Sequence, residues 1–329
     1  IFKSSTTNRL SMLSNPFGGS NNSFEAMIKK AMQYKYADNG EGIQTDALNA
    51  LEATMLTDEK TNNDVYAQVI GGYYTGSGKS MVYGGNMGYD RFITDNVILG
   101  FYLGYAYAKS SASKENNQRV YSHNAQAGIY SRIIAGHNEI DISLNNNTAF
   151  INNTEKLQLA GMDFNQEKDT MNNTTNLSLS YGYAFGLHTN EHKGALIIKP
   201  TLGVSGGYSI NRGYKEKGLA FEQKGSNAFS ANASIGLELR KYFQDGGFFY
   251  IVPGADFELY NSLSAINYNL GGIEIVMPLE DKKYIYGSLF AGGEFKITSS
   301  LSGFGSIGAK VASADRQYYS GSLGVRLKF

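Results

Sequence analysis

The sequence predicts an all-β transmembrane fold, a closed antiparallel barrel of about twelve strands. Three observations predict it. From Asp64 onward, apolar side chains alternate with small or polar ones at a period of two in segment after segment. The connections between these segments are alternately short and long. The composition, with 39 Gly, 24 Tyr, 18 Phe and only 4 Pro in 329 residues, suits many twisted strands better than helices or disorder.

Composition and charge exclude several classes of function. Acidic and basic residues balance at 29 each, so no chain-wide attraction to nucleic acid is expected. The absence of cysteine excludes disulfides, thiolate metal sites and a cysteine nucleophile. The longest apolar neighbourhood, residues 96–108, is interrupted by glycine and falls short of the ~18–20 residues that a membrane helix needs. The polar start "IFKSSTTNRL" has no initiator Met and no signal-like segment, so we interpret the chain as a piece of a longer precursor.

Residues 1–63 differ from the rest of the chain because they hold the helix-like patterns. Residues 23–37 begin with Ser23 as a plausible N-cap and carry apolar side chains at three- and four-residue spacing, namely Phe24, Met27, Ile28, Ala31 and Met32. A second helical stretch, within residues 44–58, places Leu48, Leu51 and Met55 on one stripe. The segment "DNGEG" at 38–42 separates the two.

The strand segments follow one another from residue 64 to the end of the chain. In residues 177–187, for example, Leu and aromatic side chains alternate with Ser, Gly and Ala. Such runs exceed the ~5–6 residues of a usual soluble strand and match the ~9–11 residues of a tilted membrane strand. The predicted strands are 64–75, 80–92, 96–110, 119–134, 138–153, 171–187, 195–212, 227–243, 247–263, 282–297, 300–312 and 318–329.

The connections fall into two alternating sets. Tight turns are predicted at 94–96, 135–138, 244–247 and 298–300, with 187–194 as a longer member of the same set. Long loops are predicted at 110–118, 153–170, 213–226 and 264–281. Short turns on one rim and long loops on the other are typical of a bacterial outer-membrane barrel with periplasmic and external ends. Residues 264–281 could instead form a hairpin above the membrane or a further strand.

The direction of the apolar face decides between a soluble and a membrane barrel. A soluble barrel points its apolar side chains inward, whereas a lipid-embedded barrel points them outward around a polar lumen. The polar faces carry mostly Ser, Asn, Gly and Ala, which favours a lumen. The charges expected to line that lumen are Arg132, Lys199, Glu238, Arg240, Asp256, Glu258 and Arg326, with Asp141 and Glu294 on the same faces. Tyrosine pairs near strand ends (Tyr73 and Tyr74, Tyr105 and Tyr107, Tyr318 and Tyr319) fit an interfacial girdle, although tyrosine is also simply a good strand residue.

The helical leader, the alternating strands and the closing "LGVRLKF" together resemble the translocator domain of a classical, type Va autotransporter, from about residue 20 to the end. The resemblance implies a linker and pore-helix segment at 1–63 and an outer-membrane β-barrel at 64–329. It also implies that an α-helix threads into or plugs the pore, with residues 23–37 as the candidate and 44–58 as its competitor. Phe24, Met27, Ile28 and Met32 would then touch the wall, and Lys29, Lys30 and Lys35 would find Glu238, Asp256 or Glu258. A helix packed beneath the barrel and a mobile linker are the alternative interpretations of this segment.

The last strand matches the assembly signal of outer-membrane barrels at Tyr319, Leu323, Val325, Leu327 and Phe329. The resemblance implies three partners: outer-membrane lipid, the barrel assembly machinery and a covalently linked passenger domain upstream. It implies a non-enzymatic, monomeric barrel without cofactors in the bacterial outer membrane, which exports the passenger and anchors it at the cell surface. The last strand can also simply close the barrel against the first, near Val65 to Tyr73. A plugged porin-like channel or an adhesin barrel remains the alternative function.

Three other patterns favour no site. The pairs Asn21-Asn22 and Asn62-Asn63 could serve self-cleavage, but their surroundings do not match the longer motif of self-cleaving autotransporters. His188 and His192 have a metal-like spacing only on a helix, whereas they fall in a predicted turn. Neither His123 nor His137 has a recognisable setting for an outer-membrane hydrolase. We therefore expect no catalytic and no metal residues.

Overall fold

The computed structural model describes residues 63–75, 78–94, 96–112, 119–159, 162–190, 194–215, 221–243, 247–262, 265–270, 273–278, 284–312 and 316–329. Within these residues every regular element is a strand. The predicted helices at 23–37 and 44–58 lie outside these residues. Within the described ranges, we find no helix with the length and apolar character needed to cross a membrane.

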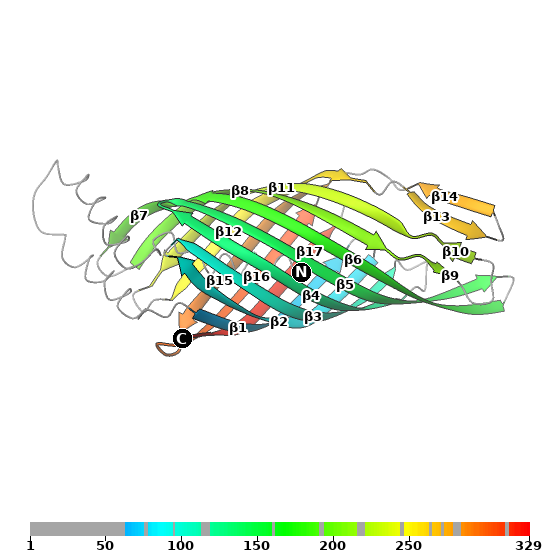
Figure 1. Cartoon of the computed structure of the whole chain (residues 1–329), viewed down its shortest axis with the longest axis horizontal. Helices are drawn as coiled ribbons and strands as arrows, with labels where there is room; N and C mark the ends of the chain where they lie inside the picture. Colours follow the sequence, from blue (N-terminus) through cyan, green and yellow to red (C-terminus); the bar gives the residue numbers. More distant parts are fainter. Residues whose placement is uncertain are drawn as a thin grey trace, which may run out of the picture.

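Twelve antiparallel strands form a closed ring (Figure 1), which confirms the predicted barrel. Each strand pairs with its neighbours in ring order, and β17 returns to pair with β1. The short strand β7 (Phe185–Asn190) follows β6 after Ala184 and pairs, like β6, with β8. The ring consists of β1 (Asn63–Thr75), β2 (Gly78–Thr94), β3 (Val97–Ala112), β4 (Arg119–Ala135), β5 (Asn138–Leu159), β6 (Met162–Tyr183), β8 (Gly194–Asn211), β11 (Ser226–Tyr242), β12 (Phe248–Asn261), β15 (Ile285–Lys296), β16 (Leu301–Ala312) and β17 (Gln317–Lys328).

The seam between β1 and β17 runs over the whole length of both strands. Its register extends from Asp64 opposite Lys328 to Thr75 opposite Gln317. Beyond the last pair, the backbone N–H of Phe329 donates to the carbonyl oxygen of Asn63 at 3.1 Å, and Asn63 Nδ2 donates to the carbonyl oxygen of Phe329 at 3.1 Å. Closure leaves no open sheet edge in the ring, as a bilayer requires of any spanning sheet.

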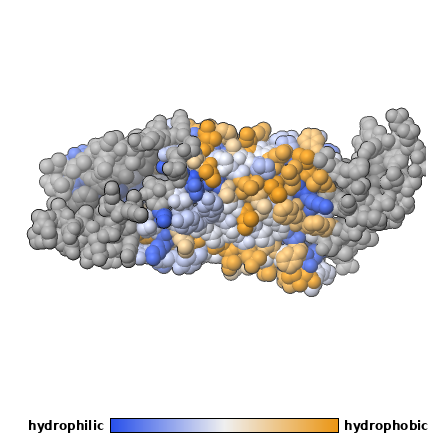
Figure 2. Space-filling model, turned by 180° about the vertical axis from the view of Figure 1, so that it is seen from behind, coloured by the Kyte–Doolittle hydropathy of each residue, from blue (hydrophilic) through white to orange (hydrophobic). Residues whose placement is uncertain are grey.

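The apolar faces of the strands point outward. Val69, Met87, Ile307 and Leu323 are 63%, 64%, 70% and 65% exposed, whereas Arg240 on the opposite face is 1% exposed. Figure 2 shows the hydrophobic residues gathered over the middle of the barrel, with hydrophilic residues toward the margins of this zone. A soluble barrel would have the reverse arrangement, so the interpretation as a membrane barrel is the one that the structure supports.

Tyrosines form part of a girdle toward the long-loop end of β2, β3 and β4. On the outer surface the ring centroids of Tyr83 and Tyr107 are 5.3 Å apart, and those of Tyr107 and Tyr121 are 6.2 Å apart. The girdle prediction was wrong for Tyr74 and Tyr318. These two residues share the lumenal side of their strands with Tyr66 and Arg326, and their rings lie 4.6 Å apart.

A patch of polar side chains interrupts the outer surface on β5 and β6. Asn146 Nδ2 donates to Asn173 Oδ1 and Thr175 Oγ1, both at 2.9 Å. Asn173 Nδ2 donates in turn to Asn146 Oδ1 at 3.0 Å and to Thr148 Oγ1 at 2.7 Å. Because these groups bind one another, the cost of facing an apolar medium is reduced.

Three of the predicted long loops contain strands. Residues 153–170 were predicted as a loop, but β5 and β6 continue their pairing through them to Leu159 opposite Met162. The loop at 213–226 contains β9 (Tyr214–Lys215) and β10 (Phe221–Gln223). Residues 264–281 form a hairpin of β13 (Ala265–Leu270) and β14 (Ile273–Pro278), one of the two alternatives for this segment. The order β14-β13-β10-β9 makes a second sheet, the external sheet, at the long-loop end of the barrel (Figure 1).

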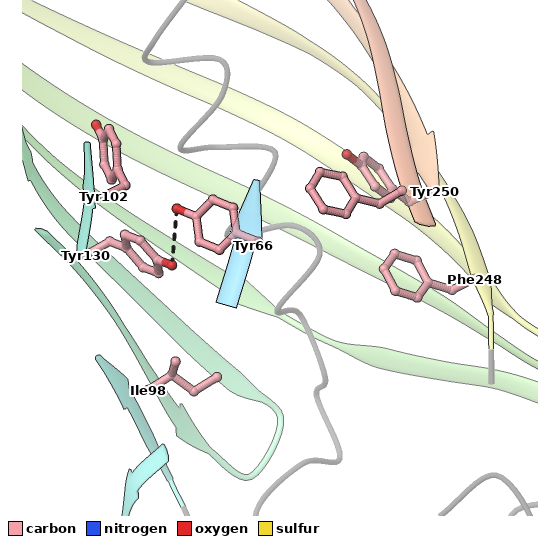
Figure 3. Packing of buried hydrophobic residues seen from close by; sticks show 7 residues of the cluster. Tyr66, Ile98, Tyr102, Tyr130, Phe248 and Tyr250 are labelled. Atoms are coloured by element: carbon pink, nitrogen blue, oxygen red, sulfur yellow. Dashed lines mark hydrogen bonds between the residues drawn. The ribbon is translucent and has the colours of Figure 1, made fainter. Parts of the chain in front are cut away.

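Aromatic rings inside the barrel pack over glycines of the neighbouring strand. Figure 3 shows several of these rings. Tyr102 lies directly opposite Gly128, and a Cβ atom on Gly128 would stand 2.4 Å from its ring. Tyr130 covers Gly100 in the same way. These rings belong to an interior aromatic cluster, which comprises Tyr66, Tyr102, Tyr130, Phe248, Tyr250 and Phe304 together with the aliphatic Ile98.

The packing of rings over glycines predicts that alanine destabilises the barrel at the covered glycines and not at uncovered ones. In Gly128→Ala the new methyl group overlaps the Tyr102 ring, and we expect a loss of about 1–3 kcal/mol in stability. The matched control is Gly71→Ala, whose methyl group would meet nothing within 4 Å. The measurement is the temperature at which the compact, fast-migrating form on a gel disappears. Equal temperatures for the two variants would contradict this account of the packing.

Candidate functional site

A belt of charged residues lines the lumen near the end of the barrel that carries the short turns. Its members are held on eight strands of the ring, so the belt surrounds most of the lumen. Most of them are buried, with Arg132 and Arg240 each 1% exposed. We call it the charged belt, and it comprises the cations Arg132, Lys199, Arg240 and Arg326 and the carboxylates of Asp64, Asp90, Glu139, Asp141, Glu238 and Glu294, with Tyr130, Phe248 and Tyr250 beside them.

Six members of the charged belt form one chain of alternating sign. It begins at Asp141, whose two carboxylate oxygens accept from Nε and Nη2 of Arg132, both at 2.6 Å. Arg132 Nη1 lies 3.5 Å from Glu139 Oε2, and the same oxygen lies 2.7 Å from Lys199 Nζ. Lys199 continues the chain to Glu238 at 3.0 Å, and Glu238 reaches Arg240 at 2.6 Å. Each charge therefore meets one of opposite sign in a region withdrawn from water.

A glycine lets this chain cross a strand. Glu139 on β5 and Lys199 on β8 stand on either side of β6, where Gly182 lies opposite Glu139. A Cβ atom on Gly182 would lie 3.0 Å from Cδ of Lys199. The missing side chain thus gives the Lys199 stem room to pass over β6 and reach Glu139.

Arg240 ends the chain among aromatic rings. Its Cζ atom is 4.7 Å from the ring centroid of Phe248 and 5.4 Å from that of Tyr250. Its Nη1 donates to the Tyr242 hydroxyl at 3.3 Å. A guanidinium over aromatic faces gains cation–π attraction, which offsets part of its loss of hydration. The charged belt and the interior aromatic cluster therefore meet at this point.

Arg326 joins three strands next to the seam. Its Nη1 lies 3.3 Å from Asp64 Oδ2 on β1, and its Nη2 donates to Glu294 on β15. Asp90 on β2 accepts a hydrogen bond of 2.5 Å from the Tyr130 hydroxyl on β4. The last strand thus contributes an interior ion pair to the closed ring in addition to its backbone pairing.

Two of the seven predicted lumenal charges lie apart from the charged belt. Asp256 Oδ2 accepts from Lys310 Nζ at 2.8 Å, in a pair whose side chains are 19% and 30% exposed. Glu258 accepts from the backbone N–H of Tyr284 at 3.2 Å and from the hydroxyl of Tyr286 at 3.1 Å. The structure thus connects Arg132, Lys199, Glu238 and Arg240, and gives Arg326, Asp256 and Glu258 other partners.

Sequence reasoning missed Glu139, Asp64 and Asp90. The alternation of side chains between the two faces of a strand could have found them, because Glu139 shares a face with Asp141, and Asp64 shares one with Tyr66. On β4, β5 and β6, toward the long-loop end, the same face carries uncharged polar groups instead. Gln126 Nε2 donates to the Tyr102 hydroxyl at 3.0 Å, and Asn176 Nδ2 donates to Asn145 Oδ1 at 3.3 Å.

The predicted assembly-signal residues lie on the outer side of β17 and at Phe329, which directly follows it. Tyr319, Leu323, Val325, Leu327 and Phe329 are all exposed, from 44% to 65%. Both edges of β17 are used within the ring, one by β16 and the other by β1. The finished barrel therefore offers the side chains of this row, but not a free backbone edge of β17.

The remaining sequence patterns fall in different settings. His123 is part of the outer girdle, with Nδ1 2.5 Å from the Tyr105 hydroxyl, and His137 Nδ1 lies 2.9 Å from the carbonyl oxygen of Ala184 beside a turn. His188 belongs to β7, a strand, and His192 lies outside the described residues, as do Asn21, Asn22 and Asn62. In the described part of the chain no three His, Asp or Glu side chains are grouped as metal ligands.

Solved structures of autotransporter translocators have the same fold. The chain superposes on the translocator domain of the autotransporter NalP from Neisseria meningitidis with a TM-score of 0.68 at 14% identity, covering 92% of this chain and 99% of that one. It superposes on the transport unit of AIDA-I from Escherichia coli with a TM-score of 0.63 at 17% identity, covering 87% and 98%. The fold is that of an autotransporter translocator barrel.

The family is more specific. Residues 9–329 match the C-terminal domain of the vacuolating cytotoxin autotransporter VacA, and the chain belongs to this family. A vacuolating cytotoxin autotransporter of Helicobacter pylori is 27% identical over 285 residues, which are 82% of this chain but 21% of that protein. A second one from the same species is 28% identical over 256 residues, 74% of this chain and 19% of that protein. The chain thus spans about a fifth of these relatives.

Family membership confirms the predicted function and location. The chain is an autotransporter translocator domain of the VacA type, and such barrels reside in the bacterial outer membrane with the passenger exported to the cell surface. The family is one of secretion domains rather than catalytic domains.

The alternating chain predicts different costs for two lumenal lysines. In Lys199→Met the carboxylates of Glu139 and Glu238 lose a common buried partner. We therefore expect the free energy of unfolding to fall by about 3–5 kcal/mol. In Lys310→Met only the partly exposed pair with Asp256 is lost. We therefore expect the free energy of unfolding to fall by about 1 kcal/mol or less. Denaturant titration of the detergent-folded barrel measures both. Lys199→Arg should restore part of the loss, and similar costs for both Met variants would refute the special role of the chain.

Proposed function

We propose that the barrel exports an upstream passenger polypeptide and keeps it anchored at the cell surface, with residues 23–37 lying as a helix in the lumen. The observation that carries the proposal is the contrast between an apolar outer surface and a lumen whose charges are paired with one another. A hydrophilic wall can pass a polar chain, and internal pairing prevents single charges from holding it. The length of the relatives, about five times the matched part, supports a long upstream segment.

The interior aromatic cluster offers a contact for the proposed helix. Phe24, Met27, Ile28 and Met32 form its apolar stripe, and an apolar stripe prefers rings such as Tyr66 to the amide-lined part of the wall. The cluster lies beside the charged belt, in which carboxylates outnumber cations. The belt would attract Lys29, Lys30 and Lys35, which stand on the same segment.

The carboxylates proposed to bind these lysines already have partners within the barrel. Glu238 binds Lys199 and Arg240, Asp256 binds Lys310, and Glu258 accepts two hydrogen bonds. An added lysine therefore gains a modest, salt-sensitive attraction. The apolar stripe would supply most of the affinity of the helix for the lumen.

We also propose that the outward row of β17 is read by the barrel assembly machinery before the ring closes. In the closed barrel both edges of β17 are occupied, so pairing with a partner barrel by β-augmentation is open only to an unclosed precursor. After closure the same row, from Tyr319 to Phe329, would face outer-membrane lipid. A single chain completes the ring, which supports a monomeric barrel.

Removal of residues 1–62 tests the helix in the lumen. The truncated barrel, which keeps all twelve strands of the ring, should conduct ions several-fold better than the complete chain in planar bilayers, because the lumen has lost its occupant. Phe24→Asp with Ile28→Asp in the full chain should raise conductance in the same direction, since the stripe can no longer pack on rings. Lys114→Ala, in a predicted external loop, is the control. Unchanged conductance on truncation would contradict a helix in the lumen.

A pair of lipid-facing substitutions tests the assembly signal. Leu323 on β17 and Ile307 on β16 are 65% and 70% exposed on the outer face. Leu323→Glu and Ile307→Glu should cost similar stability in detergent. In cells Leu323→Glu should lower the amount of assembled barrel much further, because only it also alters the recognised row. Equal amounts in cells would argue that β17 serves closure alone.

A further inference from the structure

We propose that the outer surface of β2, β3 and β4 binds the headgroup of a phosphorylated glycolipid in the outer leaflet of the membrane. Two lysines lie at the margin of this surface, next to a row of aromatic rings. We call it the basic-aromatic patch, and it comprises Lys79, Lys109, Tyr83, Tyr105, Tyr107, Tyr121 and His123. Binding here needs only the location in the outer membrane, so it is independent of the export of a passenger.

The rings of the basic-aromatic patch form a continuous row across three neighbouring strands. The ring centroid of Tyr107 lies 5.3 Å from that of Tyr83 and 6.2 Å from that of Tyr121. The imidazole of His123 lies 5.3 Å from the Tyr107 ring, and its Nδ1 is 2.5 Å from the Tyr105 hydroxyl. Tyrosine rings at a membrane interface have an apolar face and a polar hydroxyl. The row can therefore stack on the apolar face of a sugar and form hydrogen bonds with its oxygens.

The two lysines lie on the long-loop side of the rings. Lys109 Nζ is 5.8 Å from the ring centroid of Tyr121. On β2, Met81 pairs with Lys109, and Lys79 is the next outward residue beyond Met81. Both lysines are exposed, and Met81 is 56% exposed on the same face. Positive charge thus directly adjoins the apolar zone, which is the level at which lipid phosphates lie and to which a lysine can extend its ammonium group.

The polar side chains on the outer surface of β5 and β6 continue the patch toward the middle of the barrel. Ala125 on β4 stands opposite Tyr105 on one side and opposite Thr148 on the other. Thr148 is hydrogen-bonded to Asn173, which exchanges hydrogen bonds with Asn146. Each of these amide oxygens has a second lone pair, for which hydrocarbon offers no donor. The amide and hydroxyl groups that join a sugar to its acyl chains would lie beside them if the sugar covered the rings.

The chemistry of the patch favours a phosphorylated glycolipid over a phospholipid. Lysine ammonium groups bind phosphate as point charges, and both kinds of lipid carry phosphate. Only a glycolipid also has sugar faces for the row of rings. On β6 the patch is bounded by a carboxylate, since Asp169 accepts from Asn152 Nδ2 at 2.9 Å. We therefore expect the anionic headgroup to lie over β2, β3 and β4.

Titration of the detergent-folded chain with lipid A, a diglucosamine lipid with two phosphates, tests the lysines by native mass spectrometry. Lys79→Met with Lys109→Met should weaken binding by about 25-fold, about fivefold for each lysine near a charged lipid surface. The matched control is Lys241→Met at the other end of the barrel, where Lys241 Nζ lies 5.9 Å from the Phe243 ring. Its affinity should be unchanged. Heat-modifiable gel mobility verifies that each variant is folded, and equal affinities of the double variant and the control would overturn the proposal.

Three further probes identify the ligand chemistry. Dephosphorylated lipid A should bind severalfold more weakly because it lacks the charge, and phosphatidylglycerol should do so because it lacks a sugar face. An excess of inorganic phosphate should leave lipid A bound. Tyr107→Leu keeps an apolar side chain but removes the central ring, so it should weaken lipid A binding severalfold and leave phosphatidylglycerol binding unchanged, whereas the control Phe243→Leu should change neither. Equal binding of either comparison lipid, or displacement of lipid A by phosphate, would overturn the assignment to a phosphorylated glycolipid.

Discussion

The hydrogen-bonded seam between β1 and β17 is the constraint on which the rest of the barrel depends. In hydrocarbon an unpaired backbone edge costs several kcal/mol for each group, so the sheet must return to its own first strand. The seam meets this need over the full length of both strands, and Phe329 and Asn63 extend it by one further exchange. Closure then divides every strand into a face toward lipid and a face toward the lumen, and this division fixes where each kind of side chain can lie.

Once the faces are divided, polar groups must find partners wherever they are withdrawn from water. In the lumen the chain from Asp141 to Arg240 solves this problem by alternating sign, with Gly182 as the gap that lets Lys199 pass. On the outer face Asn146 and Asn173 solve it by exchanging hydrogen bonds with each other and with neighbouring threonines. Both arrangements follow one rule, because a buried or lipid-facing polar group is tolerated when its hydrogen bonds are made inside the protein.

The period-two pattern predicted the ring strands well because lipid on one side enforces strict alternation within the membrane. Outside it that pressure disappears, and the polar residues of 153–170 were therefore interpreted as a loop although they continue the β5–β6 ladder. Tyr74 and Tyr318 were wrongly assigned to the girdle, because the presence of tyrosines near a strand end does not show which face of the strand each one occupies. Ion-pair partners are harder still, because Lys199 meets Glu139 only through the stagger of β5, β6 and β8, which no single strand encodes.

The self-paired lumen also bears on how one barrel can pass a long chain of varied sequence. An isolated lumenal charge would bind each opposite charge in transit, whereas a cation already shared by two carboxylates, as Lys199 is, gains little from a third. Retention of the proposed helix at the end of export then has to come from another interaction. Apolar contact with the interior aromatic cluster would provide it, because Phe24, Ile28 and Met32 are grouped in a way that a passing polar segment is not. A wall that is electrostatically satisfied but locally aromatic would therefore let polar segments pass and hold the apolar-striped segment.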